Sequence, residues 1–285
     1  MELQILANGI VLGALYACIA VGFSLVWGVL NVINMLHGSF IILGGYITFF
    51  AWARLGIHPI AMIPVAGMIL YGLGYMVQRG VINKVVTQPV LITLTLTFGL
   101  DMILYNFMNV VFTATPKRVT LELGSFDIAG IFMPWDRMVS MLLAFALTGL
   151  LYWVMRTSRV GRAIVAVRMD RDAAALMGIR VDQIYAITFG IGAFMAGAAG
   201  ALFAVVFPVT TNLSGLYIGK AFVVCVIGGL GSVPGALAGG MVLGVIESFA
   251  GHWLGPQHAI TAGFVLMLIL LITRPSGLLG KKGYE

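Results

Sequence analysis

The chain has 285 residues, of which 61% are hydrophobic and only 9% are charged, and its mean hydropathy is +1.06. Soluble domains carry about 25% charged residues, so this composition excludes an ordinary soluble protein and indicates an integral membrane protein. The net charge of +6 does not predict nucleic-acid binding, because the basic residues lie between apolar runs and form no patch with interleaved aromatic residues.

Apolar runs long enough to cross a bilayer, which takes about 20 residues in a helix, recur along the whole chain. They predict an all-α polytopic membrane protein with eight or nine spans in a single transmembrane domain over residues 1–285. The seventh and eighth runs are short, and we expect them to be half-spans or one broken hairpin. The expected spans are 5–29, 36–52, 59–78, 90–112, 137–156, 183–207, 218–231, 235–251 and 259–274.

Polar residues and glycine interrupt the apolar sequence between the first two spans, at Asn34, His37, Gly38 and Ser39. Backbone freed from a helix at membrane depth is tolerated only where it is buried in protein or lines a water-filled cavity. The segment therefore predicts a broken helix beside a transport pathway. His37 has two interpretations that stay open: it hydrogen-bonds the interrupted backbone, or it lines the pathway.

The fourth span contains a carboxylate, Asp101, with Tyr105 and Asn109 one and two turns further on. This spacing places the three polar groups on one helix face. An ionisable residue inside a span is a candidate functional residue, but a polar stripe also serves to bond neighbouring helices. We favour the bonding role for Asp101.

Six of the sixteen basic residues lie in the 156–182 segment, and short basic loops remain in the cytoplasm. With this segment inside, the N-terminus is expected outside, and the C-terminus with Lys281 and Lys282 is expected inside. No Lys or Arg precedes Arg54, so the first run lacks the basic start of a signal peptide and is expected to be a retained span. The 113–136 loop is then external, where a binding partner can reach it.

Within the 156–182 segment, residues 170–178 predict a short helix. Asp170 or Asp172 lies near its positive N-terminal end, the helix formers Ala173 and Ala174 follow, and Gly178 stops it. The alanines leave a flat surface that a groove of another protein can approach closely. We therefore expect this helix to dock onto a cytoplasmic partner.

A second interruption, with Gly229, Gly231 and Ser232, separates the seventh and eighth runs. Like the first interruption it contains a Gly-Ser pair and precedes two adjacent glycines, as expected for paired broken helices in the two halves of a transporter. In a hairpin that turns here, Lys220 and Glu247 reach similar depth, about 17 Å from the turn at 1.5 Å per residue. We expect the two charges to pair, since an unpaired buried charge is costly, and we favour a structural role over substrate binding.

These segments together carry a resemblance to a known family. The strings Asn34-Met-Leu-His37-Gly38, Gly44-Gly45-Tyr46, Gly197-Ala-Ala-Gly200 and Gly228-Gly229-x-Gly231-Ser232, in this order, are similar to those of LivH-type permease subunits of branched-chain amino acid ABC importers. Residues 172–178 resemble the Glu-Ala-Ala-x-x-x-Gly loop by which such permeases dock onto their ATPases, with Asp172 in the place of Glu and without the Leu-Pro ending.

The resemblance implies a subunit that forms half of a translocation pathway in a bacterial inner membrane. It also implies a LivM-type second permease, two cytoplasmic ATPases, and a periplasmic binding protein that delivers leucine, isoleucine or valine. Related permeases carry urea, short amides or aromatic acids, so these substrates remain alternatives. ATP and magnesium would bind to the ATPase subunits, and this chain is expected to be no enzyme and to bind no cofactor or metal.

Two other function classes were weighed from the residues. An ion-coupled carrier would show several carboxylates along its spans, but only Asp101 and Glu247 qualify. A channel would present a ring of charges or carbonyls in an oligomer, for which the sequence gives no clear sign. The string nearest to an ATPase phosphate loop, 215–221, is one residue short and lacks the hydroxyl that holds magnesium, so the energy source is expected on another chain.

Overall fold

The computed structural model describes residues 2–121, 124–128, 131–274 and 276–279. This part of the chain contains nine helices long and apolar enough to cross a membrane, when the short 3-10 turns that flank two of them are included. They are α1 (Glu2–Leu30), α2 (Leu36–Leu55), α3 (Pro59–Gly80), α4 (Val90–Phe112), α5 (Trp135–Thr157), α8 (Val181–Val206), α9 (Ser214–Gly228), α10 (Val233–Trp253) and α11 (Pro256–Thr273). The two short helices α6 (Arg159–Met169) and α7 (Arg171–Leu176) follow α5.

All nine apolar runs are helices, which confirms the all-α class, but the expected half-spans need correction. Helix α10 has 21 residues and is a full span, and α9 has 15 residues extended by the 3-10 turn η2 (Thr211–Leu213). The half-spans were expected because the apolar runs 218–231 and 235–251 are short, and Gly239 and Gly240 belong to the second of these runs. Both glycines lie inside α10, where a Cβ atom on Gly239 would come within 2.4 Å of the Val224 carbonyl oxygen.

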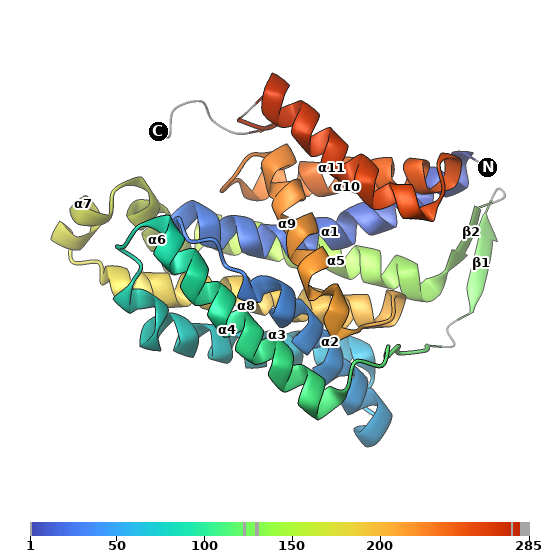
Figure 1. The fold of residues 1–285 in the computed structure, drawn as a ribbon, viewed down its shortest axis with the longest axis horizontal. Coiled ribbons are helices and arrows are strands. Elements are labelled where there is room, and N and C mark those ends of the chain that lie inside the picture. The colour runs from blue at the N-terminus through green and yellow to red at the C-terminus, as the bar shows by residue number, and fades with distance from the viewer. Residues whose placement is uncertain (1, 122–123, 129–130, 275, 280–285) are drawn as a thin grey trace.

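Helices α1 and α8 form the centre of the molecule, because nearly all of their membrane-length residues are buried. Helix α1 packs mainly against α10 and α8, while α8 packs mainly against α3 and α2. The peripheral helices α4, α5 and α11 expose most of their side chains (Figure 1). The chain is therefore a bundle built around two central helices, and the outer helices are free to face lipid or another subunit.

Small residues let the central backbones approach closely, as in other membrane bundles. A Cβ atom on Gly13 would lie 2.8 Å from the Cα of Met241, and one on Gly200 would lie 1.9 Å from the Ile41 carbonyl oxygen. These contacts hold α1 against α10 and α2 against α8, and they leave no room for a larger side chain.

The two interruptions lie at different depths in the bundle. Only residues 31–35 are non-helical in the first, so His37, Gly38 and Ser39 belong to the first turns of α2. The second comprises residues 229–232, between α9 and α10. The first leads into the interior, where the His37 ring nitrogen Nε2 lies 3.0 Å from the carbonyl oxygen of Ile19, eleven residues before the end of α1. The second lies at the end of the bundle, since a Cβ atom on Gly28, near the end of α1, would lie 2.6 Å from the Cα of Gly231.

The connecting segments gather at opposite ends of the molecule. At one end, the hairpin of β1 (Ser125–Ile128) and β2 (Ile131–Pro134) lies near the N-terminus, and the Phe132 N–H donates to Gln4 Oε1 at 2.7 Å (Figure 1). At the other end lie α6 and α7, which turn most of the expected 156–182 loop into helix. The basic pair Lys281 and Lys282 lies outside the described residues.

Candidate functional site

Helix α7 is capped at both ends by the residues that the sequence singled out. The Asp170 carboxylate accepts hydrogen bonds from the Asp172 and Ala173 amides, both at 2.9 Å, and so satisfies N–H groups that the first helical turn leaves open. Gly178 ends the segment in the left-handed region, with φ +83°. The predicted helix and its end at Gly178 are confirmed, and Asp170 is the capping residue.

The α7 segment exposes two large apolar side chains to solvent beside its charged residues. Ala174 is the buried side chain, whereas Leu176 and Met177 are 89% and 83% exposed. Asp172 is exposed and forms an ion pair of 3.3 Å with Arg171. Sequence reasoning missed Leu176 and Met177, which were detectable as the two large apolar residues directly before the glycine. Two such side chains on a projecting helix are typical of a surface that another protein covers.

Helix α6, which the sequence did not predict, holds α7 against the bundle. Its first turn is capped by Ser158, whose hydroxyl accepts from the Gly161 amide at 2.8 Å. Ile164 and Val167 point into the protein and are almost fully buried, so α6 lies on the bundle through one apolar face. A Cβ atom on Gly161 would lie 2.3 Å from the Met155 carbonyl oxygen, which explains the glycine at this sharp turn from α5.

The charges of Lys220 and Glu247 pair inside the membrane, as expected from their matched depth. Lys220 Nζ lies 2.7 Å from Glu247 Oε2, and both residues are more than nine-tenths buried. The Tyr16 hydroxyl of α1 donates to the same Oε2 at 2.8 Å and also contacts Lys220 Nζ. The sequence had not included Tyr16, a polar-tipped residue in the middle of the first span. The cluster ties α9 and α10 to α1.

The residues of the first interruption are buried within the chain. The His37 ring nitrogen Nε2 lies 3.0 Å from the Ile19 carbonyl oxygen, and the ring packs edge-on against Phe23. Position 38 has room only for glycine, because a Cβ atom there would lie 2.3 Å from the Ser214 carbonyl oxygen. The buried amide of Asn34 has no hydrogen-bond partner among the described residues. None of these side chains faces an opening in this conformation.

The polar stripe of α4 bonds to neighbouring elements. Asp101 Oδ1 accepts from the Ser39 hydroxyl at 2.5 Å, and the Tyr105 hydroxyl donates to Asn212 Oδ1 at 3.0 Å. Asn109 Oδ1 accepts from the Thr211 hydroxyl at 2.5 Å. The stripe thus joins α4 to α2 and to the segment before α9. These contacts agree with the role that we favoured for Asp101, which is to bond neighbouring helices.

The second interruption forms a tight turn. Gly229 and Gly231 both have positive φ, at 101° and 77°, which a residue with a side chain rarely adopts. Ser232 then caps α10, since its hydroxyl accepts from the Gly235 amide at 3.1 Å. The structure therefore brings the expected residues into four separate places: the α7 segment, the 229–232 turn, the buried start of α2 with Asp101 beside Ser39, and the Lys220–Glu247 cluster.

Comparison with known proteins decides the family. Residues 5–273 match the family model described as branched-chain amino acid transport system / permease component. The chain belongs to this permease family. It is 32% identical to the high-affinity branched-chain amino acid transport system permease protein LivH of Salmonella typhimurium, over 99% of this chain and 97% of that protein.

Two further relatives are the permease protein BraD of Pseudomonas aeruginosa and the permease protein LivM of Escherichia coli. BraD is 32% identical, over 99% of this chain and 97% of its own length. LivM is 26% identical, over 93% of this chain and 68% of its own length. No solved structure matches the chain.

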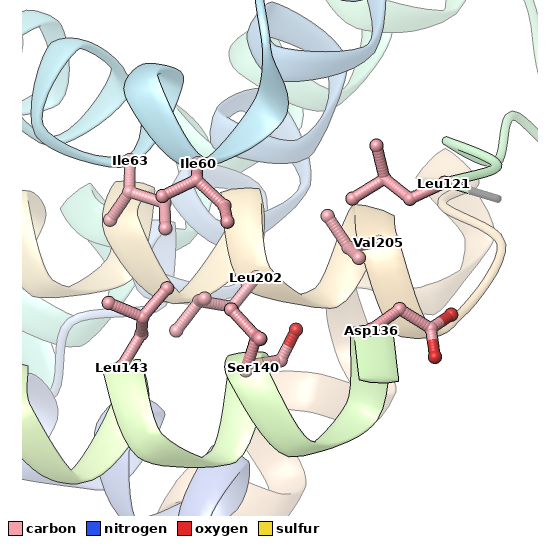
Figure 2. Close-up of a pocket in the computed structure, with 9 residues that line it drawn as sticks. Ile60, Ile63, Leu121, Asp136, Ser140, Leu143, Leu202 and Val205 are labelled. Carbon is pink, nitrogen blue, oxygen red and sulfur yellow. The ribbon is translucent and has the colours of Figure 1, made fainter. Parts of the chain in front are cut away.

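The permease has a small enclosed pocket where α3, α5 and α8 meet, at the end that carries the β hairpin (Figure 2). Its walls are apolar side chains such as Ile63, Leu143 and Leu202, and Asp136 lies at its rim. Its volume of about 10 Å³ is room for about one water molecule, so it is no substrate cavity. A wider open groove of about 580 Å³ runs along the first half of α4, between Leu91 and Ile103.

Proposed function

We propose that this permease is the transmembrane subunit of an ATP-driven importer and forms half of a translocation pathway for branched-chain amino acids. The observation that carries the proposal is α7, a capped helix that projects from one end of the bundle and exposes Leu176 and Met177. The identity of 32% to the LivH and BraD permeases over nearly the whole chain supports the substrate class.

The proposal includes four kinds of partner. Two ATPase subunits, which bind ATP and magnesium, would cover α7 from the cytoplasm. A LivM-type permease would complete the pathway, as the similarity to LivM supports. A periplasmic binding protein would deliver the substrate at the end of the β hairpin. The N-terminus would then be periplasmic and the C-terminus cytoplasmic, in a bacterial inner membrane.

The surface of α4 supports a pathway or a second permease on its side of the bundle. Asp101, Tyr105 and Asn109 are only partly buried, and Asn106 is exposed. Polar groups at membrane depth are costly against lipid and normally face protein or a water-filled cavity. We therefore infer that this face of α4 meets the pathway or the second permease in the assembled importer.

The charges inside the spans support ATP as the energy source over an ion gradient. Lys220 and Glu247 form a buried ion pair with each other, and the Ser39 hydroxyl donates a hydrogen bond to Asp101. An ion-coupled carrier needs carboxylates that exchange their ion during each cycle. The buried pair is a poor candidate for such exchange.

The test is uptake of labelled leucine into vesicles that contain the permease with or without its co-expressed partner subunits. We expect ATP-dependent uptake only with the ATPases, and an excess of unlabelled valine or isoleucine should suppress it. Suppression by urea, short amides or aromatic acids instead would change the substrate class. Uptake by this chain alone, driven by an ion gradient, would overturn the proposal.

Variants of α7 test the docking role. Gly178→Leu forces a side chain into the left-handed region, and Asp172→Arg reverses a charge on the exposed face, so both should reduce ATPase binding while the membrane fold persists. Lys84→Gln, an exposed change elsewhere at the same end, is the control. ATPases that co-purify and hydrolyse ATP normally with both α7 variants would contradict the docking role.

A further inference from the structure

A charged side chain of α6 contacts the turn between α9 and α10. Arg168 lies in the last turn of α6, and its Nη1 donates to the Gly231 carbonyl oxygen at 2.7 Å. The guanidinium also lies against the Gly231 backbone, because a Cβ atom there would come within 2.9 Å of Nη2. A charged donor on a backbone carbonyl forms one of the stronger hydrogen bonds in proteins.

On the α6 side, Arg168 is close to the partner-facing helix. Asp170 ends α6 and also caps α7, so the two helices share a residue that lies two positions after Arg168. Two carboxylate-to-amide bonds hold that junction. A partner that displaces α7 would therefore displace Arg168 with it.

On the membrane side, the turn is a meeting point of several segments. Gly28 of α1 packs against Gly231 without room for a side chain. The Leu278 and Leu279 amides donate to the Ile227 and Gly228 carbonyl oxygens at 2.8 and 3.1 Å, at the end of α9. The two helices that leave this turn carry Lys220 and Glu247, which bond to Tyr16 of α1. Movement of the turn would thus reach the interior of the bundle through α9 and α10.

We propose that Arg168 is a positioning residue that links α6 and α7 to the α9–α10 hairpin, so that movement imposed on α7 by an ATPase shifts the inner end of the hairpin. The inference rests on the proposed function and adds the route of coupling within this chain. The planar guanidinium suits this role because its donors have fixed directions. The positive φ of Gly231 helps to set the direction of the Gly231 carbonyl, which accepts the hydrogen bond from Arg168.

The test uses the assembled importer in vesicles and compares Arg168→Ala, Arg168→Lys and Arg162→Ala with the unaltered chain. Arg162 is the matched control, because it lies on the same helix and, within the part of the chain that the structure describes, donates only to the Thr157 carbonyl oxygen, at 3.0 Å. We expect Arg168→Ala to keep its melting temperature, its bound ATPases and its ATP hydrolysis, while uptake per ATP falls about tenfold. Arg168→Lys should recover part of the loss, and Arg162→Ala should behave as the unaltered chain.

A second measurement follows the turn itself. A spin label on Leu230→Cys, a 42% exposed residue of the turn, should change its spectrum on ATP binding in the unaltered background and not with Arg168→Ala. The native Cys18 and Cys225 are fully buried, so background labelling should be low. Normal uptake per ATP with Arg168→Ala, or a loss that only follows loss of folded protein or bound ATPase, would overturn the inference. If the unaltered importer shows no ATP-dependent uptake, the proposed function itself fails.

Discussion

Among the single residues, Lys220 and Glu247 restrict the packing of the bundle most, because they form an ion pair inside it. Both charges are more than nine-tenths buried, and Tyr16 adds a third polar group to the cluster. A buried pair contributes little net stability compared with apolar residues, yet removing one partner leaves an isolated charge. The cluster therefore matters more for how α1, α9 and α10 fit together than for total stability.

A charge swap tests this interpretation. Lys220→Glu and Glu247→Lys should each cost about 3–5 kcal/mol of stability, because each leaves two like charges in the interior. The double variant should restore much of the yield, since opposite charges again meet. The measurement is folded yield and melting temperature in detergent. Single variants that fold normally and change only substrate affinity would assign the pair to binding.

The glycine contact of α2 gives a second prediction for single residues. Gly38→Val should sharply reduce folded protein, because the added side chain would collide with the Ser214 carbonyl oxygen, 2.3 Å from the Cβ position. Gly99→Ala in α4 is the control, since a Cβ atom there meets nothing within 4 Å. His37→Ala completes the set: a fall in yield without a fall in transport per molecule would make the histidine structural. Equal yields for Gly38→Val and Gly99→Ala would show that α2 can shift.

Among the elements, α7 depends on its cap more than a long helix would. It has six residues, fewer than an isolated helix needs, so the two hydrogen bonds to Asp170 and the support of α6 hold it in place. Ala174 is its one buried residue, so the helix forms no core of its own. Its order should therefore respond to single substitutions that leave the bundle unchanged.

Asp170→Ala should reduce ATPase binding several-fold, because loss of a helix cap costs about 1 kcal/mol. Asp170→Ser should recover most of the binding, since a hydroxyl also accepts from these amides. The measurement is the amount of ATPase that co-purifies at a fixed concentration, with the melting temperature of the permease as control. Equal binding by the alanine and serine variants would exclude a role for the cap.

For the whole molecule, the odd number of spanning-length helices among the described residues, nine, predicts that Glu2 and Leu279 lie on opposite sides of the membrane. The contacts agree with this arrangement, because Gln4 bonds to the hairpin end whereas the Leu278 and Leu279 amides bond near Gly231 at the other end. The assignment of these ends to periplasm and cytoplasm rests on the basic 156–182 segment.

Cysteine labelling tests the orientation. Leu3 and Met177 are 61% and 83% exposed at opposite ends, and the native cysteines are fully buried. An impermeant maleimide should label Leu3→Cys in intact spheroplasts, whereas Met177→Cys should react only after the membrane is opened. The reverse result would invert the topology and would place α7 where no ATPase can reach it.

The sequence by itself determined the features that depend on local composition. Apolar length predicted eight or nine spans, of which the described residues show nine as helices of spanning length, because a helix must satisfy its backbone over the thickness of the bilayer. Local spacing also gave the end of α7 at Gly178, and equal distance from the turn gave the pairing of Lys220 with Glu247. Each of these follows from residues on one helix or one hairpin.

Other features were decided only by tertiary structure. Gly239 lies within α10, and only the tertiary structure shows that the Val224 carbonyl oxygen approaches too closely for a side chain there. Tyr16 joins the ion pair, and Arg168 meets the Gly231 carbonyl, across sequence separations of 231 and 63 residues. No local pattern encodes such contacts, because they depend on which helices pack side by side and at what depth.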